Sequence, residues 1–136
     1  MMTCERITRA SEIQSVMTLC PHTVRIEQSV TAAREMMEEH GCRHLPVVAD
    51  HEIVGIISHR DIQFALGWAK SSAAELDIRD VYIPEPFIVA PTAPLVGVID
   101  RMGRDHIGCA IVAVQNRVVG IITTTDVCRL FAEHVR

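Results

Sequence analysis

The feature that most constrains the fold of this chain is an internal repeat. The stretch Val54-Gly55-Ile56-Ile57-Ser58-x-x-Asp61 returns 65 residues later as Val119-Gly120-Ile121-Ile122-Thr123-x-x-Asp126. Other identities fall at the same offset, such as Val47 and Val112. A repeat with one constant spacing predicts two copies of one supersecondary unit, each too small to bury its apolar face without its twin.

Both copies show the same order of predicted elements. In the first they are a helical turn (11–17) capped by Ser11, a strand (23–26), a helix from Ser29 to the stop at Gly41, two strands (44–48 and 53–57), and a helix that begins near Asp61. The polar turn between the paired strands predicts antiparallel pairing, and the helical crossover predicts parallel pairing of the first strand. We therefore expect an α+β fold made of two β-α-β-β-α repeats with pseudo-two-fold symmetry.

The repeat also sets the expected domain boundaries. We place one domain at 11–69 and the other at 76–134, as parts of one intertwined module. The small, polar residues of 70–75 form the predicted linker.

Composition limits the possible partners. The formal net charge of −4 argues against a nucleic-acid-binding surface, which is usually basic. The longest apolar runs are about six residues, too short to span a bilayer. The N-terminus lacks the apolar region of a signal peptide, and five cysteines without a C-x-x-C pair suit reduced thiols. We expect a cytoplasmic protein with no nucleic-acid or membrane partner.

The hydroxyl-x-x-Asp turn at Ser58 and Thr123 is the main candidate for chemistry. A strand that runs into a helix N-terminus presents free N–H groups to a phosphate, and an aspartate there can accept hydrogen bonds from ribose hydroxyls. The same spacing is close to a capping box, in which the side chains only begin the helix. The residues alone leave both interpretations open.

The sequence gives little support for enzyme activity or for a metal site. The chain has no nucleophile elbow, P-loop or Ser-His-Asp order, so we expect no enzyme activity. Of the seven histidines, His44 lies closest to a cysteine, in Cys42-x-His44, but no second pair has zinc-site spacing. We expect no metal site.

The repeated motifs together resemble a tandem pair of CBS domains, the Bateman module. The likeness rests on Val16-Met17-Thr18, on Arg43-His44-Leu45-Pro46-Val47-Val48 and on the two hydroxyl-x-x-Asp turns, and it covers nearly the whole chain. The chain looks like a stand-alone module of this kind.

The resemblance implies two clefts between the repeats that bind adenosyl ligands: AMP, ADP or ATP, and in some members S-adenosylmethionine or NAD. The aspartates would hold ribose, Ser58 and Thr123 would face phosphate, and Ile56, Ile121 and Phe87 would pack on adenine. One cleft would use Ile121, Thr123, Thr125 and Asp126 with Thr18, His22, Cys42 and Arg43. The other would use Ile56, Ser58, Arg60 and Asp61 with Ile83, Phe87, Ile107 and Gly108.

The second repeat departs from the family pattern, because Ile83 replaces the hydroxyl residue found at Thr18. This favours the cleft built on Asp126. Since Lys70 is the one lysine in the chain, we expect AMP or ADP rather than ATP.

The resemblance further implies a homodimer through the helices that follow the aspartates, which carry Trp68 and Phe131. Trp68 could equally cover the protein's own core. The function implied is a sensor that relays ligand occupancy to a regulated protein that the sequence does not identify. The alternative is a dimerisation or interaction module with vestigial clefts.

Overall fold

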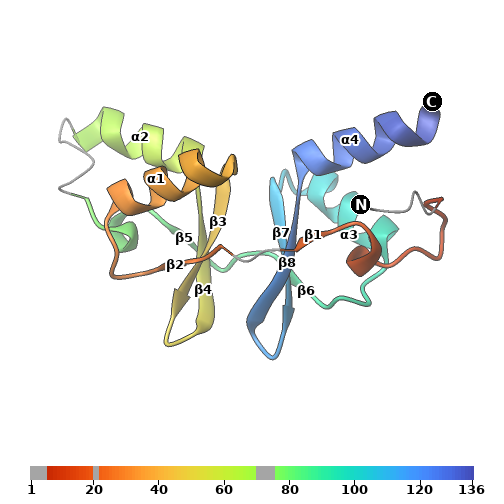
Figure 1. The fold of residues 1–136 in the computed structure, drawn as a ribbon, viewed down its shortest axis with the longest axis horizontal. Coiled ribbons are helices and arrows are strands. Elements are labelled where there is room, and N and C mark those ends of the chain that lie inside the picture. Colours follow the sequence, from red (N-terminus) through yellow and green to blue (C-terminus); the bar gives the residue numbers. More distant parts are fainter. Residues whose placement is uncertain (1–5, 20–21, 70–75) are drawn as a thin grey trace. The chain divides into compact units, whose positions relative to one another are not determined.

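The computed structural model of the protein describes residues 6–19, 22–69 and 76–136. The predicted linker at 70–75 lies outside the described residues. The chain forms two compact units (Figure 1): a central unit, Pro21–Pro86, and a terminal unit that combines Met1–Cys20 with Phe87–Arg136. No helix within the described ranges has the length and apolar character to cross a bilayer.

The central unit contains a four-stranded sheet in the order β2-β3-β4-β5. Its elements are β2 (Val24–Arg25), α1 (Val30–His40), β3 (His44–Ala49), β4 (Glu52–Ser58), α2 (His59–Ala69), a 3-10 helix (Ile78–Asp80) and β5 (Ile83–Pro84). β2 pairs with β3 in parallel across the α1 crossover, and β3 pairs with β4 in antiparallel fashion. Both pairings confirm the sequence prediction.

The terminal unit repeats this plan with the sheet order β1-β8-β7-β6. Its elements are a 3-10 helix (Ile13–Ser15), β1 (Thr18–Leu19), β6 (Ile88–Val89), α3 (Leu95–Arg104), β7 (Cys109–Val114), β8 (Arg117–Thr123) and α4 (Thr124–Val135). β6 pairs with β7 in parallel, and β7 with β8 in antiparallel fashion. The α+β fold with two repeats is confirmed.

In each unit, a short segment comes from the N-terminal part of the sequence repeat that does not supply the rest of that unit. β1 pairs with β8 and β5 pairs with β4, so each edge strand comes from the repeat that does not supply the rest of its sheet. The backbone N–H of Ile13 donates to Ala93 O at 2.8 Å in the terminal unit, and that of Ile78 donates to Gln28 O at 2.9 Å in the central unit.

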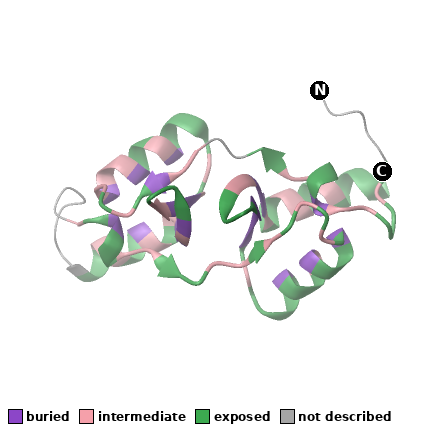
Figure 2. Ribbon diagram, turned by 90° about the horizontal axis from the view of Figure 1, so that it is seen from below, coloured by how far each residue is buried: buried purple, intermediate pink, exposed green. Residues whose placement is uncertain are grey.

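The two cores use matching positions of the repeat. Val24, Leu45, Val47 and Ile57 are buried in the central unit, where Ile78 from the second repeat joins them. In the terminal unit the buried residues are Ile13, Leu95, Val98, Met102, Ala110, Val112 and Ile122. Figure 2 shows that buried residues lie on the inward sides of helices and strands within each unit. Each core therefore depends on an isoleucine contributed by the other repeat.

Local signals explain both ends of α1, and one predicted cap is wrong. Ser29 Oγ accepts a hydrogen bond from Ala32 N at 3.1 Å, and Gly41 ends α1 with a φ of 65°. Ser11 was predicted to cap the first helical turn, but Glu12 occupies the N-cap position. Ser11 Oγ instead accepts a hydrogen bond from Thr8 N. The Asp50-His51 turn has positive φ at both residues, which matches the twist that a tight hairpin needs.

Candidate functional site

Both hydroxyl-x-x-Asp turns form capping boxes at strand-to-helix junctions. In the central unit, Ser58 N donates to Asp61 Oδ2 at 3.0 Å and Asp61 N donates to Ser58 Oγ at 3.0 Å. In the terminal unit, Thr123 N donates to Asp126 Oδ2 at 2.8 Å and Asp126 N donates to Thr123 Oγ1 at 3.3 Å. The capping interpretation of these residues is therefore confirmed, and it leaves ligand binding open because a cap can also face a ligand.

The two aspartates differ in their surroundings. Asp126 also accepts from Thr123 Oγ1 at 3.0 Å, and its Oδ1 lies 3.8 Å from Arg129 Nη1. Among the described residues, Asp61 Oδ1 has no hydrogen-bond or ion-pair partner, since Phe64 stands where the other repeat has Arg129. Each carboxylate thus keeps acceptor capacity beyond the cap, and that of Asp126 has an arginine nearby.

The exchanged strands bring predicted binding residues beside these turns. Thr18 on β1 is the register partner of Ile121 on β8, and Ile83 on β5 is the partner of Ile56 on β4. Ile121 is buried, whereas 48% of Ile83 is exposed. The structure therefore brings together one predicted pair from each cleft, and it does so within a single unit in each case.

The residues just before β3 and β7 occupy equivalent places in the two units. Cys42 N donates to Met37 O at 3.1 Å, and Ile107 N donates to Met102 O at 2.9 Å. One residue later, Arg43 O accepts from His59 N at 2.8 Å. Likewise, Gly108 O accepts from Thr124 N at 3.1 Å. These carbonyls hold the start of each sheet against the start of the helix that follows the hydroxyl-x-x-Asp strand.

The remaining predicted residues are distributed between the units. His22, Cys42, Arg43 and Arg60 belong to the central unit, and Phe87, Ile107, Gly108 and Thr125 belong to the terminal unit. Each predicted cleft thus draws on both units, and its membership stays a prediction.

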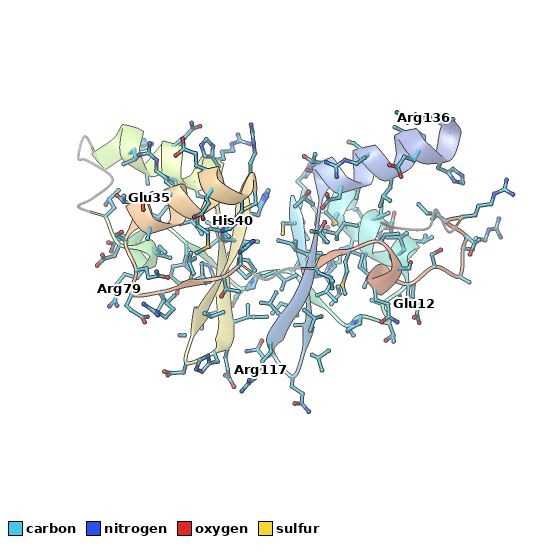
Figure 3. The ribbon with its side chains drawn as sticks, in the orientation of Figure 1. Glu12, Glu35, His40, Arg79, Arg117 and Arg136 are labelled. Atoms are coloured by element: carbon cyan, nitrogen blue, oxygen red, sulfur yellow. The ribbon has the colours of Figure 1, made fainter. Side chains whose placement is uncertain are left out.

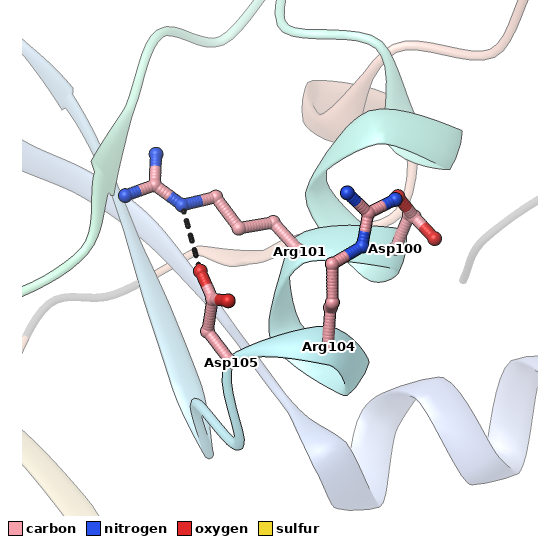
Figure 4. A network of polar contacts seen from close by, with 4 residues as sticks. All are labelled: Asp100, Arg101, Arg104 and Asp105. Atoms are coloured by element: carbon pink, nitrogen blue, oxygen red, sulfur yellow. Dashed lines mark hydrogen bonds and ion pairs between the residues drawn. The ribbon is translucent and has the colours of Figure 1, made fainter.

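Arg101 covers one face of Phe87, which the resemblance assigned to adenine packing. The Arg101 guanidinium carbon lies 4.7 Å from the Phe87 ring centroid, a cation–π distance. Arg101 Nε also donates to Asp105 Oδ2 at 3.4 Å (Figure 4), and Arg104 pairs with Asp100 on the same helix. Adenine would have to use the other face of Phe87 or displace Arg101.

A hollow of about 360 Å³ opens in the central unit beside the end of α1. Its lining comes from α1, the loop before β3 and the first residue of α2: Arg34, Met37, Glu38, Gly41, Cys42, Arg43 and His59. Burial raises the pKa of the Cys42 thiol above its ordinary value of 9.0, so Cys42 is a neutral, apolar part of this wall at neutral pH. Sequence analysis did not identify Arg34 and Glu38 as candidate binding residues, although they lie four residues apart on one face of the helix that ends at Gly41.

Two histidines stack near the same helix end. The His22 and His40 rings stack with centroids 3.6 Å apart, and His40 Nε2 lies 4.0 Å from Glu39 Oε2. Within the part of the chain that the structure describes, no three His, Cys, Asp or Glu residues are grouped to hold a metal ion.

A model of the CBS domain family matches the chain twice, over residues 10–67 and 78–133. The chain belongs to the CBS domain family. The predicted tandem CBS pair is thereby confirmed, and the hydroxyl-x-x-Asp turns and exchanged strands described above are those of its two CBS repeats.

Known proteins resemble the chain over most of its length. Inosine-5'-monophosphate dehydrogenase of Korarchaeum cryptofilum is 32% identical over 106 residues, 77% of this chain and 21% of that enzyme. Hypoxic response protein 1 of Mycobacterium tuberculosis is 28% identical over 134 residues, 94% of this chain and 88% of that protein. The CBS domain pair of protein MJ0100, solved with 5'-methylthioadenosine and S-adenosyl-L-methionine, has a TM-score of 0.83 at 27% identity and covers 91% of this chain and 98% of that one.

The first curated relatives are much longer than this chain. The chain spans between 21% and 24% of their length, and they are enzymes of different kinds.

Proposed function

We propose that the protein is a non-catalytic regulatory module that binds an adenosyl ligand at its two hydroxyl-x-x-Asp turns. The observation that carries the proposal is the pair of capping boxes at Asp61 and Asp126. Each ties one carboxylate oxygen, Oδ2, to its own backbone and leaves capacity on the other for ribose hydroxyls. The MJ0100 domain pair, which was solved with two adenosyl compounds, supports the ligand class.

The local structure suits such a ligand. The N-termini of α2 and α4 follow these turns, and the helix dipoles favour a negatively charged group there. Ile56 is half-buried and Ile121 buried at the strand positions just before the turns, where they offer apolar surface to a base. AMP or ADP is the proposed nucleotide, with S-adenosylmethionine and NAD as the other members of the class.

Regulation would follow from population shift. A ligand that binds one conformation more tightly than another raises the population of that conformation, and a partner protein can read the change. We place the module in the cytoplasm, since Cys42, Cys109 and Cys128 are free thiols in the structure.

We also propose that the protein forms a homodimer through α2. Phe64 and Trp68 lie on one side of this helix with ring centroids 6.1 Å apart, and 67% and 76% of their surfaces are exposed. The interpretation of Trp68 as a core residue is therefore wrong. Exposed aromatic pairs of this kind are typical of protein interfaces. Phe64→Ser with Trp68→Ser should shift the sedimentation coefficient to that of a monomer.

Thermal unfolding with a ligand panel tests the binding proposal. AMP, ADP, ATP, NAD and S-adenosylmethionine are added separately, and a ligand at 100 times its dissociation constant should add about 2.7 kcal/mol to the free energy of unfolding. The absence of a shift with every compound would favour the interaction module with vestigial clefts, which the exposure of Ile83 and Ile88 also suits.

A further inference from the structure

An arginine covers part of the Phe87 ring in the terminal unit. Phe87 is half-buried and packs against the core of that unit. The guanidinium carbon of Arg101, on α3, lies 4.7 Å from the centre of the ring, a cation–π distance. The ring therefore meets the core and also carries a cation, and a planar base can pack on the covered face only after Arg101 has moved away.

The arginine is held by weak contacts at the surface. Its side chain is 63% exposed, and its Nε donates to Asp105 Oδ2 at 3.4 Å (Figure 4), which is long for a hydrogen bond. Ion pairs and cation–π contacts between exposed groups are individually weak. Arg101 can thus leave the ring at a small cost, and this cost lowers the affinity of any ligand that takes its place.

The first sequence repeat has no arginine at this place. At the constant offset of 65 residues, Arg101 corresponds to Met36 and Phe87 to His22. His22 stacks instead on His40, the last residue of α1 (Figure 3), with ring centroids 3.6 Å apart. The arginine cover is therefore a feature of the second repeat and not of the architecture that the repeats share.

We infer that Arg101 competes with adenine for the face of Phe87 and thereby lowers the affinity for adenosyl ligands of the predicted cleft that combines Phe87 with Asp61. The inference rests on the proposed function and on the predicted packing of adenine against Phe87, and it makes Arg101 an affinity-determining residue. The competition concerns the base alone. A ligand with a phosphate and a ligand without one should therefore be affected alike.

Titrations of three ligands into paired variants test this role. Adenosine has the base without a phosphate, AMP has both, and ribose 5-phosphate has the phosphate without the base. Every protein in the comparison carries Asp126→Ala, which is expected to silence the other cleft, so that isothermal titration reports the cleft of Phe87. Arg101→Ala removes the cover. Arg104→Ala is the matched control, since Arg104 is an exposed arginine of the same helix that pairs with Asp100 instead of covering Phe87.

Removal of the cover should strengthen the two ligands that contain the base. Arg101→Ala should bind adenosine and AMP about threefold more tightly, the fold-change that corresponds to the loss of an exposed cation–π contact. The affinity for ribose 5-phosphate should stay as it was, and Arg104→Ala should change none of the three. In a Phe87→Leu background, Arg101→Ala should give no gain, because the gain depends on the ring. Arg101→Gln repeats the test if Arg101→Ala does not fold.

Three results would overturn the inference. Weaker binding of adenosine and AMP alike in Arg101→Ala would mean that the base stacks on the guanidinium itself. Weaker binding of AMP and ribose 5-phosphate, with adenosine unchanged, would mean that Arg101 holds the phosphate. Equal affinities in Arg101→Ala and Arg104→Ala would mean that the cover has no effect on the cleft.

Failure of the proposed function has a different signature. If the parent protein binds an adenosyl ligand but the Asp126→Ala protein binds none, with or without Arg101→Ala, the inference is wrong and the proposed function stands for the cleft built on Asp126. If no protein of the series binds any adenosyl ligand, the parent included, both are wrong.

Discussion

The backbone of Gly55 on β4 lies directly against the ring of Tyr82, which precedes β5. A methyl group on Gly55 would overlap that ring and stand 2.5 Å from the carbonyl oxygen of Ile83. Gly120 has the same relationship with Met17 in the terminal unit, where a methyl group would stand 3.1 Å from Thr18 O. β5 and β1, the edge strands that the repeats exchange, therefore pack against glycines at positions that leave no room for a side chain.

Gly55→Ala should destabilise the protein by about 2–3 kcal/mol, because both a ring and a backbone carbonyl would have to move. Gly120→Ala should cost about 1 kcal/mol, since the flexible Met17 side chain can shift more easily. Urea unfolding followed by circular dichroism measures both changes. Gly67→Ala on α2 is the control, because its methyl would meet nothing within 4 Å and should stabilise the helix by up to about 1 kcal/mol. Equal effects of all three substitutions would contradict this explanation.

The caps make a separate prediction about stability. Ser58→Ala and Thr123→Ala each remove the acceptor for the N–H of the following aspartate, so each should lower the free energy of unfolding by about 1 kcal/mol in the absence of ligand. Thr124→Ala, on an exposed side chain next to the cap, is the matched control. A loss below about 0.3 kcal/mol in both cap variants would show that these boxes contribute little to folding.

Cys42 predicts a change in stability at alkaline pH. Burial raises the pKa of its thiol above 9.0, so the folded protein holds the proton more tightly than the unfolded chain. The resulting stability is fully present below the unfolded pKa and is lost as pH rises through the folded pKa. The free energy of unfolding should therefore fall more steeply above pH 9 in the parent protein than in Cys42→Ala. Parallel curves for the two proteins would contradict this.

The two aspartates allow the clefts to be ranked. The cleft built on Asp126 keeps Thr18 on its exchanged strand, whereas the one built on Asp61 meets Ile83. Asp126→Ala should therefore reduce the ligand-induced thermal shift more than Asp61→Ala does. The comparison uses the same ligand at the same concentration, and the reverse order would show that the central unit holds the stronger site.

Much of the fold was predictable because local signals for helix ends and turns stand in a sequence whose pattern occurs twice. Ser29 and Gly41 mark the ends of α1, and the polar residues around Asp50 predict the hairpin. The strands Thr18–Leu19 and Ile83–Pro84 were not predicted, because two residues carry no alternation and their pairing is fixed by Gly120 and Gly55, far away in the sequence. Long-range packing decided these elements.

The candidate site was predictable in part for the same reason. The turns at Ser58 and Thr123 were visible because strand, hydroxyl and aspartate are contiguous. Arg34 was missed, because on a helix its spacing to Glu38 is that of an ordinary exposed pair. Only the fold shows that Arg34 lines the same hollow as Arg43 and His59.

The most direct test of the central claim is a calorimetric titration of AMP and S-adenosylmethionine into the parent protein and into the double variant Asp61→Ala/Asp126→Ala. We predict saturable binding of at least one of these ligands to the parent protein, and loss of that binding in a double variant whose circular dichroism spectrum is unchanged. Binding of equal affinity in the folded double variant would contradict it.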